Sequence, residues 1–194
     1  MSWYCDFAPG NPVHEDYHER EYGFPRIDET ALFEILALEV FQPGLSWDIV
    51  LRKRPTTAIA FGGFDVDRVA AYGDADVTRL LADPGIIRNR LKVAAVIENA
   101  RRIRRLRESD GGFSLWLARH HPLNRAEWTK LFRDTFKFMG PEVVGEFLMC
   151  NGYLPGAHRQ SCPVYPRIAR LDPPWMQVDQ GIYDNKKNNP KSGS

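Results

Sequence analysis

Two Cys–His pairs stand near opposite ends of this 194-residue chain and constrain its fold more than any other feature. The first pair is Cys5 and His18, and the second, about 140 residues later, is His158 and Cys162. Two thiolates and two imidazoles form the ligand set of a closed tetrahedral zinc site, which leaves no open position for a substrate. Such a metal would join the two ends of one domain. Taken singly, each residue is more often a buried thiol or a core histidine than a ligand.

Length and composition indicate one globular domain. A chain of 194 residues can bury a substantial core without disulfides, and three cysteines with no signal peptide are expected of a reducing cytoplasm. No apolar run reaches the roughly 18 residues of a membrane helix, so no membrane partner is expected. The net charge of +1 leaves the partner open. The basic run from Arg101 to Arg107 is most simply a solvated helix face, with a functional basic face as the alternative.

Helical periodicity runs through the sequence and no segment alternates as a strand would, which predicts an all-α fold. Asp28, Ser46 and Asp65 each precede a helical segment and are predicted N-caps. Pro55 is expected to end the second of these helices, because a proline inside a helix removes a hydrogen bond. The longest predicted helix ends at Gly111-Gly112.

A helix–hairpin–helix motif is predicted over about residues 125–150. A helix near 125–135 leads into the tight turn 136–140, and Pro141 suits the first position of the next helix. Backbone N–H groups of such a turn can bind a phosphate, so Lys137, Phe138 and Gly140 are candidate DNA contacts. The alternative is an ordinary helical corner. We assign residues 1–179 to a single α-helical domain and expect the polar segment 180–194 to be a disordered tail.

Glu39 lies in the apolar stripe of its predicted helix, in register with the leucines three and seven positions before it. A carboxylate there costs several kcal/mol unless it has a partner. It therefore pairs with a cationic side chain, turns outward at the helix end, or awaits a ligand that supplies the partner. Trp47 begins the next helix, Tyr17 adjoins His18, and Phe7 lies close to Cys5. These rings beside a buried acid predict a stacking pocket for a planar ligand, although each ring alone is more often core.

In their order along the chain, these features resemble the bacterial 3-methyladenine DNA glycosylase I family from about residue 5 to residue 162. The matching strings are dense and co-linear, which makes chance a poor explanation. They are Cys5, Tyr17-His18-Glu19, Glu21 to Pro25, Leu32-Phe33-Glu34, Leu38-Glu39, Gln42 with Gly44 to Trp47, Lys53-Arg54, Gly85 to Lys92, Phe136 to Gly140, and His158 with Cys162.

The resemblance implies an all-α helix–hairpin–helix glycosylase with a zinc clasp that joins the N- and C-terminal segments. Its implied activity is base-excision repair, by hydrolysis of the N-glycosidic bond of 3-methyladenine in double-stranded DNA. We expect a cytoplasmic monomer that forms no covalent intermediate with DNA. The residues carried over are Cys5, His18, His158 and Cys162 as Zn²⁺ ligands, Glu39 and Tyr17 as catalytic residues, and Trp47, Phe7 and Gln42 as base contacts.

Several positions depart from the family pattern. Phe7 and Tyr22 stand where members usually carry tryptophan, Pro43 replaces an alanine, and Glu142 places a carboxylate in the first turn after the hairpin. Two alternatives therefore stay open: a non-catalytic, zinc-clasped module that binds DNA, and a glycosylase for another alkylated purine. A zinc hydrolase is disfavoured, because the sequence has no H-E-x-x-H motif and four protein ligands leave no open metal position.

Overall fold

The computed structural model describes residues 4–183, and this part of the chain is helical with no β-strand, as the sequence predicts. The α-helices are α1 Tyr4–Phe7, α2 Glu15–Arg20, α3 Glu29–Phe41, α4 Trp47–Ala60, α5 Val66–Ala70, α6 Asp74–Ala82, α7 Arg90–Asp110, α8 Phe113–His120, α9 Arg125–Thr135, α10 Pro141–Cys150 and α11 Tyr165–Ala169. Three 3₁₀ turns join them, namely η1 Gly62–Phe64, η2 Pro174–Gln177 and η3 Gln180–Ile182. The predicted all-α fold class is confirmed.

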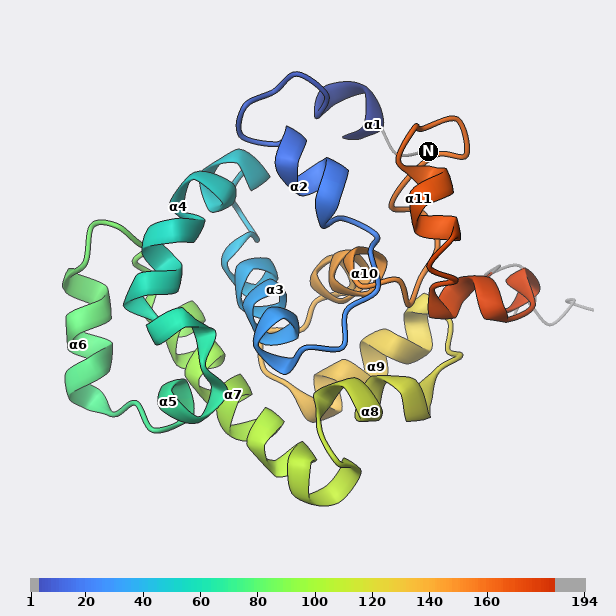
Figure 1. Ribbon diagram of the computed structural model, residues 1–194. Coiled ribbons are helices and arrows are strands. Elements are labelled where there is room, and N and C mark those ends of the chain that lie inside the picture. The colour runs from blue at the N-terminus through green and yellow to red at the C-terminus, as the bar shows by residue number, and fades with distance from the viewer. Residues whose placement is uncertain (1–3, 184–194) are drawn as a thin grey trace, which may run out of the picture.

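Helix α3 lies in the middle of the molecule and organises the packing of the others (Figure 1). Every residue from Ile35 to Phe41 is buried, Glu39 included, and a helix that is apolar all round belongs in a core. Helices α10, α7, α4 and α8 pack against it. Helices α1 and α2 lie on the same side of this core as α11, so the N-terminal segment adjoins a late segment of the chain there (Figure 1).

The predicted helix starts are confirmed by side-chain caps. The Asp28 carboxylate accepts from the Ala31 N–H at 2.8 Å, and the Asp65 carboxylate accepts from the Arg68 N–H at 2.7 Å. Ser46 caps α4. The long helix α7 ends as predicted at Gly111, whose φ of 82° is the left-handed conformation that glycine adopts without strain.

Pro55 does not end its helix, and that prediction is wrong. Helix α4 runs through Pro55 to Ala60. The ring removes one intrahelical donor, but the turn after it buries Thr57 and Ala60 against the core, which offsets the loss. The turn before it is held by Arg54, whose guanidinium pairs with Glu21 and Glu34 at 2.6 and 2.8 Å.

The basic run on α7 is engaged within the fold. Arg101 and Arg102 donate to backbone carbonyls of Ala70, Tyr72 and Thr135, and the run also pairs with carboxylates of Glu98, Asp67 and Glu29. These contacts join α7 to α3, α5 and the end of α9. They favour a structural role for the run over a functional basic face.

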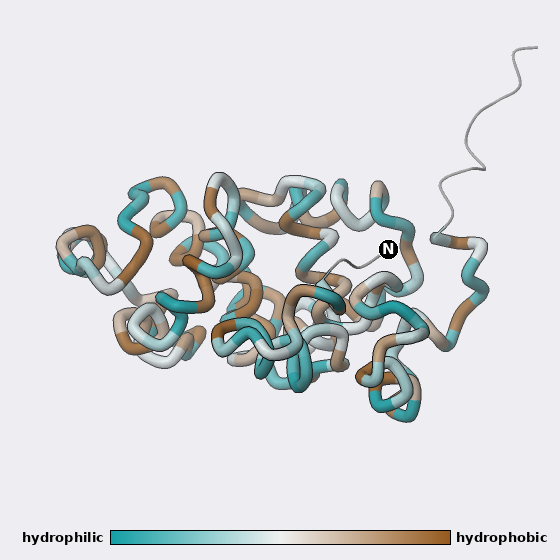
Figure 2. Tube along the Cα trace, turned by 90° about the horizontal axis from the view of Figure 1, so that it is seen from above, coloured by the Kyte–Doolittle hydropathy of each residue, from teal (hydrophilic) through white to brown (hydrophobic). Residues whose placement is uncertain are grey.

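Figure 2 shows hydrophobic and hydrophilic residues alternating along most helices, which is the pattern of amphipathic helices around a shared core. Within residues 4–183, none of the helices combines the length and apolarity needed to cross a bilayer. The boundary placed at residue 180 stays a prediction. The described chain continues through η3 to Tyr183, whose hydroxyl lies 3.0 Å from His121 Nε2, and residues 184–194 of the expected tail lie outside the described residues.

Candidate metal centre and acidic pocket

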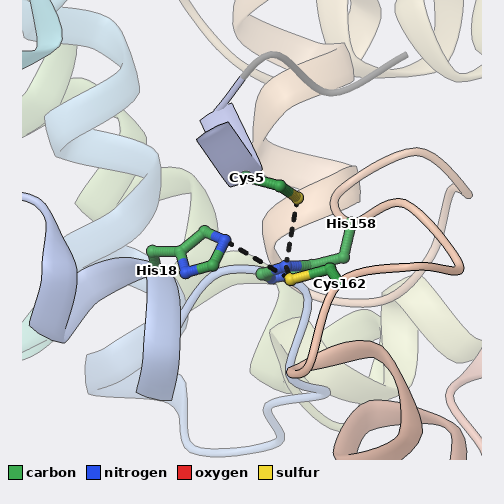
Figure 3. Close-up of side chains that lie close together, drawn as sticks. All are labelled: Cys5, His18, His158 and Cys162. Atoms are coloured by element: carbon green, nitrogen blue, oxygen red, sulfur yellow. Dashed lines mark hydrogen bonds between the residues drawn. The ribbon is translucent and has the colours of Figure 1, made fainter. Parts of the chain in front are cut away.

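Cys5, His18, His158 and Cys162 come together as one buried cluster (Figure 3). Their ligand atoms all lie within 4.8 Å of one another. His158 Nδ1 is 3.7 Å from Cys5 Sγ and 3.4 Å from Cys162 Sγ, and His18 Nε2 is 3.8 Å from Cys162 Sγ. Sulfur and nitrogen ligands of a tetrahedral zinc ion are about 3.6 Å apart, as follows from bond lengths of about 2.3 and 2.1 Å. The four side chains therefore fit a metal ion at their centre.

Neighbouring groups orient both imidazoles for ligation. His158 Nε2 lies 2.7 Å from the carbonyl of Tyr22, so this nitrogen carries the proton and donates it. His18 Nδ1 lies 3.1 Å from a carboxylate oxygen of Glu19 and donates in the same way. In each ring the opposite nitrogen then presents its lone pair to the sulfur atoms, which is the tautomer that a metal requires.

Glu39 is 4% exposed and makes no side-chain hydrogen bond or ion pair within residues 4–183. Burial raises the pKa of its carboxyl well above the usual range, and the nearby charge of Glu146 raises it further. Three arrangements were expected for this acid: a salt bridge, an outward turn at the helix end, or a site that awaits a ligand. In the described part of the chain, Glu39 neither forms a salt bridge nor turns outward. What remains is an acid whose charged form lacks a counter-charge.

Two buried tyrosines, Tyr17 and Tyr22, lie near enough to this acid for its charge to raise their pKa. Tyr17 is buried, its ring centroid lies 5.3 Å from that of Trp47, and its hydroxyl is 3.2 Å from Cys150 Sγ. Burial raises the pKa of Tyr17, and the charges of Cys150 and Glu39 add to this effect. The phenol therefore stays neutral and can donate a hydrogen bond at its hydroxyl. The fold thus brings Tyr17 against Trp47 and within reach of the charge of Glu39, and a base pocket formed by these residues stays a prediction.

Phe7 occupies a more peripheral place than Tyr17 and Trp47. Its ring is 45% exposed and stacks on Tyr4, with 6.5 Å between centroids and 28° between planes. The Tyr4 ring is in turn 6.4 Å from that of Tyr17, centroid to centroid. Tyr4 therefore connects Phe7 with Tyr17, and its hydroxyl is held 3.0 Å from His14 Nδ1.

The loop that delivers Trp47 is fixed from two sides. The Gln42 amide donates to the Leu45 carbonyl at 3.1 Å and closes the turn before Trp47. The Lys92 ammonium of α7 is buried and donates to the carbonyls of Phe41 and Pro43 at 2.7 and 2.6 Å. Gln42 therefore shapes the loop with its side chain, while Lys92 anchors the loop to α7.

The hairpin between α9 and α10 is attached to the same helix. Asn99 of α7 accepts from the Lys137 N–H at 2.7 Å and donates to the Lys137 carbonyl at 3.1 Å. This clamp presents Phe138, which is 41% exposed at a φ of 66°, and it leads into Gly140, the N-cap residue of α10. The Phe138 ring lies 6.0 Å from the Lys92 ammonium. Pocket loop and hairpin are thus held by two side chains of α7, two helical turns apart.

A family model described as methyladenine glycosylase matches residues 7–165 of this chain. The chain belongs to the methyladenine glycosylase family. It is 33% identical over 181 residues to DNA-3-methyladenine glycosylase 1 of Escherichia coli (strain K12), covering 84% of this chain and 96% of that protein. It is 30% identical over 182 residues to DNA-3-methyladenine glycosylase of Haemophilus influenzae, covering 84% of this chain and 98% of that protein.

Solved structures of the methyladenine glycosylase family share the fold. The 3-methyladenine DNA glycosylase I from Staphylococcus aureus superposes with a TM-score of 0.73 at 30% identity, covering 83% of this chain and 95% of that one. A variant of 3-methyladenine DNA glycosylase I, solved in complex with 3-methyladenine, superposes equally well, with a TM-score of 0.73 at 30% identity. It covers 83% of this chain and 96% of that one. The resemblance drawn from the sequence is confirmed.

Several residues that support the candidate site were not predicted from the sequence. Lys92 and Asn99 carry a usable signal, since each is a polar residue on the apolar stripe of a long helix and is buried in the structure. Tyr4 is found only once the fold places it beside Tyr17. Glu146 carries the same signal as Glu39, an acid on the buried face of its helix three residues after Val143.

Proposed function

We propose that this chain is a DNA glycosylase that releases 3-methyladenine from double-stranded DNA. The observation that carries the proposal is the buried carboxyl of Glu39, which has no partner within residues 4–183 and acts on Tyr17, whose ring packs near that of Trp47. The family match and the names of the relatives support it, as does the related structure with bound 3-methyladenine. The glycosidic bond inside a duplex is out of reach, so the target base must first leave the stack at a cost of a few kcal/mol.

Positive charge on the alkylated base is the basis of recognition. A base methylated at N3 while still attached to deoxyribose is a cation, and aromatic rings attract a desolvated cation by about 0.5–2 kcal/mol. Glu39 is positioned to accept a hydrogen bond from the exocyclic amine, and its negative charge then gains the counter-charge that the protein itself does not provide. Normal adenine is neutral, so its weaker interactions with the rings and with Glu39 offset less of the energy needed to unstack it. Trp47 and Tyr17 supply rings, and Phe7 acts at the edge through Tyr4.

Hydrolysis then needs little acid–base chemistry. Water attacks C1′ of the sugar, the bond from C1′ to the base nitrogen breaks, and its electron pair leaves with the base. The cationic base departs neutral, and the surplus proton of the attacking water passes to solvent. No protein nucleophile takes part, so the enzyme is monofunctional. Lys137 lies on the exposed hairpin, and we assign it with Phe138 and Gly140 to the DNA backbone.

We assign Zn²⁺ to the cluster of Cys5, His18, His158 and Cys162 as a structural ion. Burial lowers the pKa of His158 to about 4, which keeps the imidazole in the neutral form that binds metals. When bound, the ion supplies the positive charge that two buried thiolates need. The ligands come from the N-terminal segment and from the loop before α11, so the ion would hold the pocket residues Tyr4 and Tyr17 against the core.

Release of free base from methylated duplex DNA tests the function. The purified full-length chain, with its metal content measured, is incubated with DNA treated with a methylating agent, and released purines are separated by chromatography. The proposal predicts 3-methyladenine as the main product from a monomer that works in the cytoplasm, where its substrate is. Release of a different alkylated purine would reassign the substrate. Tight DNA binding without release of any base would make this chain a binding module.

A further inference from the structure

A second acid lies on helix α10, which packs against α3, the helix that carries Glu39. Glu146 is half-buried, and one of its carboxylate oxygens accepts a hydrogen bond of 2.9 Å from the Tyr22 hydroxyl. Tyr22 is buried, and its ring centroid lies 5.8 Å from that of Tyr17. The hydrogen bond therefore holds Glu146 on the side of α10 that faces the aromatic pocket. The base recognition proposed for Glu39, Tyr17 and Trp47 does not involve Glu146.

The two carboxyl groups interact electrostatically. After burial, the charge of Glu146 is the remaining influence that raises the pKa of Glu39. The other titratable groups that interact with Glu39 are Tyr17, Tyr22 and Cys150, which are neutral in their ordinary state, and the guanidinium of Arg26 donates to Cys150 Sγ at 3.4 Å. Within residues 4–183 no lysine or arginine bonds to Glu39. Two adjacent carboxyl groups without a counter-ion do not both ionise readily.

Tyr22 and two charged groups, Arg125 and Glu142, act on the Glu146 carboxyl. Burial raises the pKa of Glu146, the Tyr22 hydrogen bond and the charge of Arg125 lower it, and the charge of Glu142 raises it. Arg125 is itself shared, since it pairs with Glu142 at 3.0 Å. The negative charge of Glu146 is therefore only partly compensated, and it remains available to act on Glu39.

We infer that Glu146, held by Tyr22, is a second and specificity-determining acid of the base site, which with Glu39 makes the site selective for purines that carry a positive charge. This inference rests on the proposed function and deepens it. A cationic base entering the site brings a counter-charge that favours the ionised form of Glu39 despite the charge of Glu146, and the proton of Glu39 passes to solvent. A neutral purine brings no such charge and leaves Glu39 protonated. The pair thus rejects undamaged adenine by electrostatics as well as by stacking.

The pH dependence of excision tests this role. Single-turnover release of 3-methyladenine from duplex DNA is measured against pH for wild type, Glu146→Gln and Glu108→Gln. Wild-type activity rises with pH as Glu39 ionises, and Glu146→Gln moves that rise to lower pH by about one unit. Glu146→Gln also lowers the ratio of the release rate of 3-methyladenine to that of hypoxanthine, which is a neutral lesion. A purely structural role for Glu146 would lower the rate at every pH without moving the profile.

Glu108→Gln is the control, because it removes one carboxylate from an exposed position on α7 whose charge does not act on Glu39 or Glu146. Its profile stays where that of wild type lies. Tyr22→Phe, which removes the hydrogen bond and keeps the ring, shifts the profile in the same direction as Glu146→Gln, since a more easily protonated Glu146 repels Glu39 less. Profiles of Glu146→Gln and wild type that superimpose would overturn the inference.

A direct titration separates failure of this inference from failure of the proposed function. Carboxyl ¹³C signals are followed by NMR against pH, with the Glu39 signal assigned by its loss in Glu39→Gln. The inference predicts a lower titration midpoint for Glu39 in Glu146→Gln than in wild type. An unchanged midpoint would refute it even if the wild-type chain releases no base at all. Absence of base release together with a shifted midpoint would instead reject the proposed function and leave the coupled pair established.

Discussion

Lys92→Met tests how the fold holds the loop that carries Trp47. The methionine keeps most of the buried stem and removes the ammonium, whose two donors satisfy the carbonyls of Phe41 and Pro43. Each orphaned carbonyl costs about 1–3 kcal/mol, so about 2–6 kcal/mol of stability is at stake. Part of this is recovered, because the ammonium no longer has to be desolvated; burial already lowers the pKa of Lys92. We expect a net loss of about 2–4 kcal/mol.

Urea unfolding followed by tryptophan fluorescence measures this loss, and single-turnover base release measures its effect on the pocket. Lys53→Met is the matched control, since Lys53 donates to one backbone carbonyl, that of Pro84, from an exposed position. We expect it to change stability by about 0.5 kcal/mol or less. Base release should fall in Lys92→Met under conditions where the protein is still folded. Equal unfolding midpoints for wild type and Lys92→Met would show that this lysine does not hold the loop.

Three further perturbations bear on the acid, the hairpin and the clasp. Glu39→Gln should be more stable than wild type at pH 8 but not at pH 4. The raised pKa of Glu39 favours the neutral carboxyl, so wild type loses stability as pH rises. Thermal melts of both proteins at the two pH values check this. Asn99→Ala should cost about 1–3 kcal/mol and weaken DNA binding in a fluorescence titration, because it releases both backbone groups of Lys137; undiminished affinity would contradict the clamp. Cys162→Ala should reduce the bound zinc and lower the melting temperature by about 5 °C or more; unaltered zinc content and melting would refute the clasp.

Local signals in the sequence predicted most helix ends correctly. Asp28, Ser46 and Asp65 cap their helices because a short polar side chain satisfies the first N–H groups wherever the chain around it starts a helix. The failure at Pro55 has a different origin. The local cost of a proline was outweighed by burial of the residues that follow it, and burial depends on the whole fold.

The candidate site could be predicted in part. Glu39 was identifiable because an acid in an apolar stripe is unusual whatever the tertiary fold, and the four metal ligands were identifiable by type. Glu146 has the same signal, but its meaning depends on Tyr22 and Glu39, which only the packing of α10 on α3 brings near it. Likewise Tyr4 enters the pocket through tertiary contacts that no local pattern encodes.

The central claim is that the carboxyl of Glu39 recognises the alkylated base. Single-turnover release of 3-methyladenine from duplex DNA by Glu39→Gln tests it most directly, with zinc content and melting temperature measured on the same samples. Glu34→Gln on the same helix serves as control, since Glu34 pairs with Arg54 and lies outside the pocket. We predict a rate at least about 10²-fold below wild type for Glu39→Gln and a near wild-type rate for Glu34→Gln. A wild-type rate in a folded Glu39→Gln protein would contradict the account.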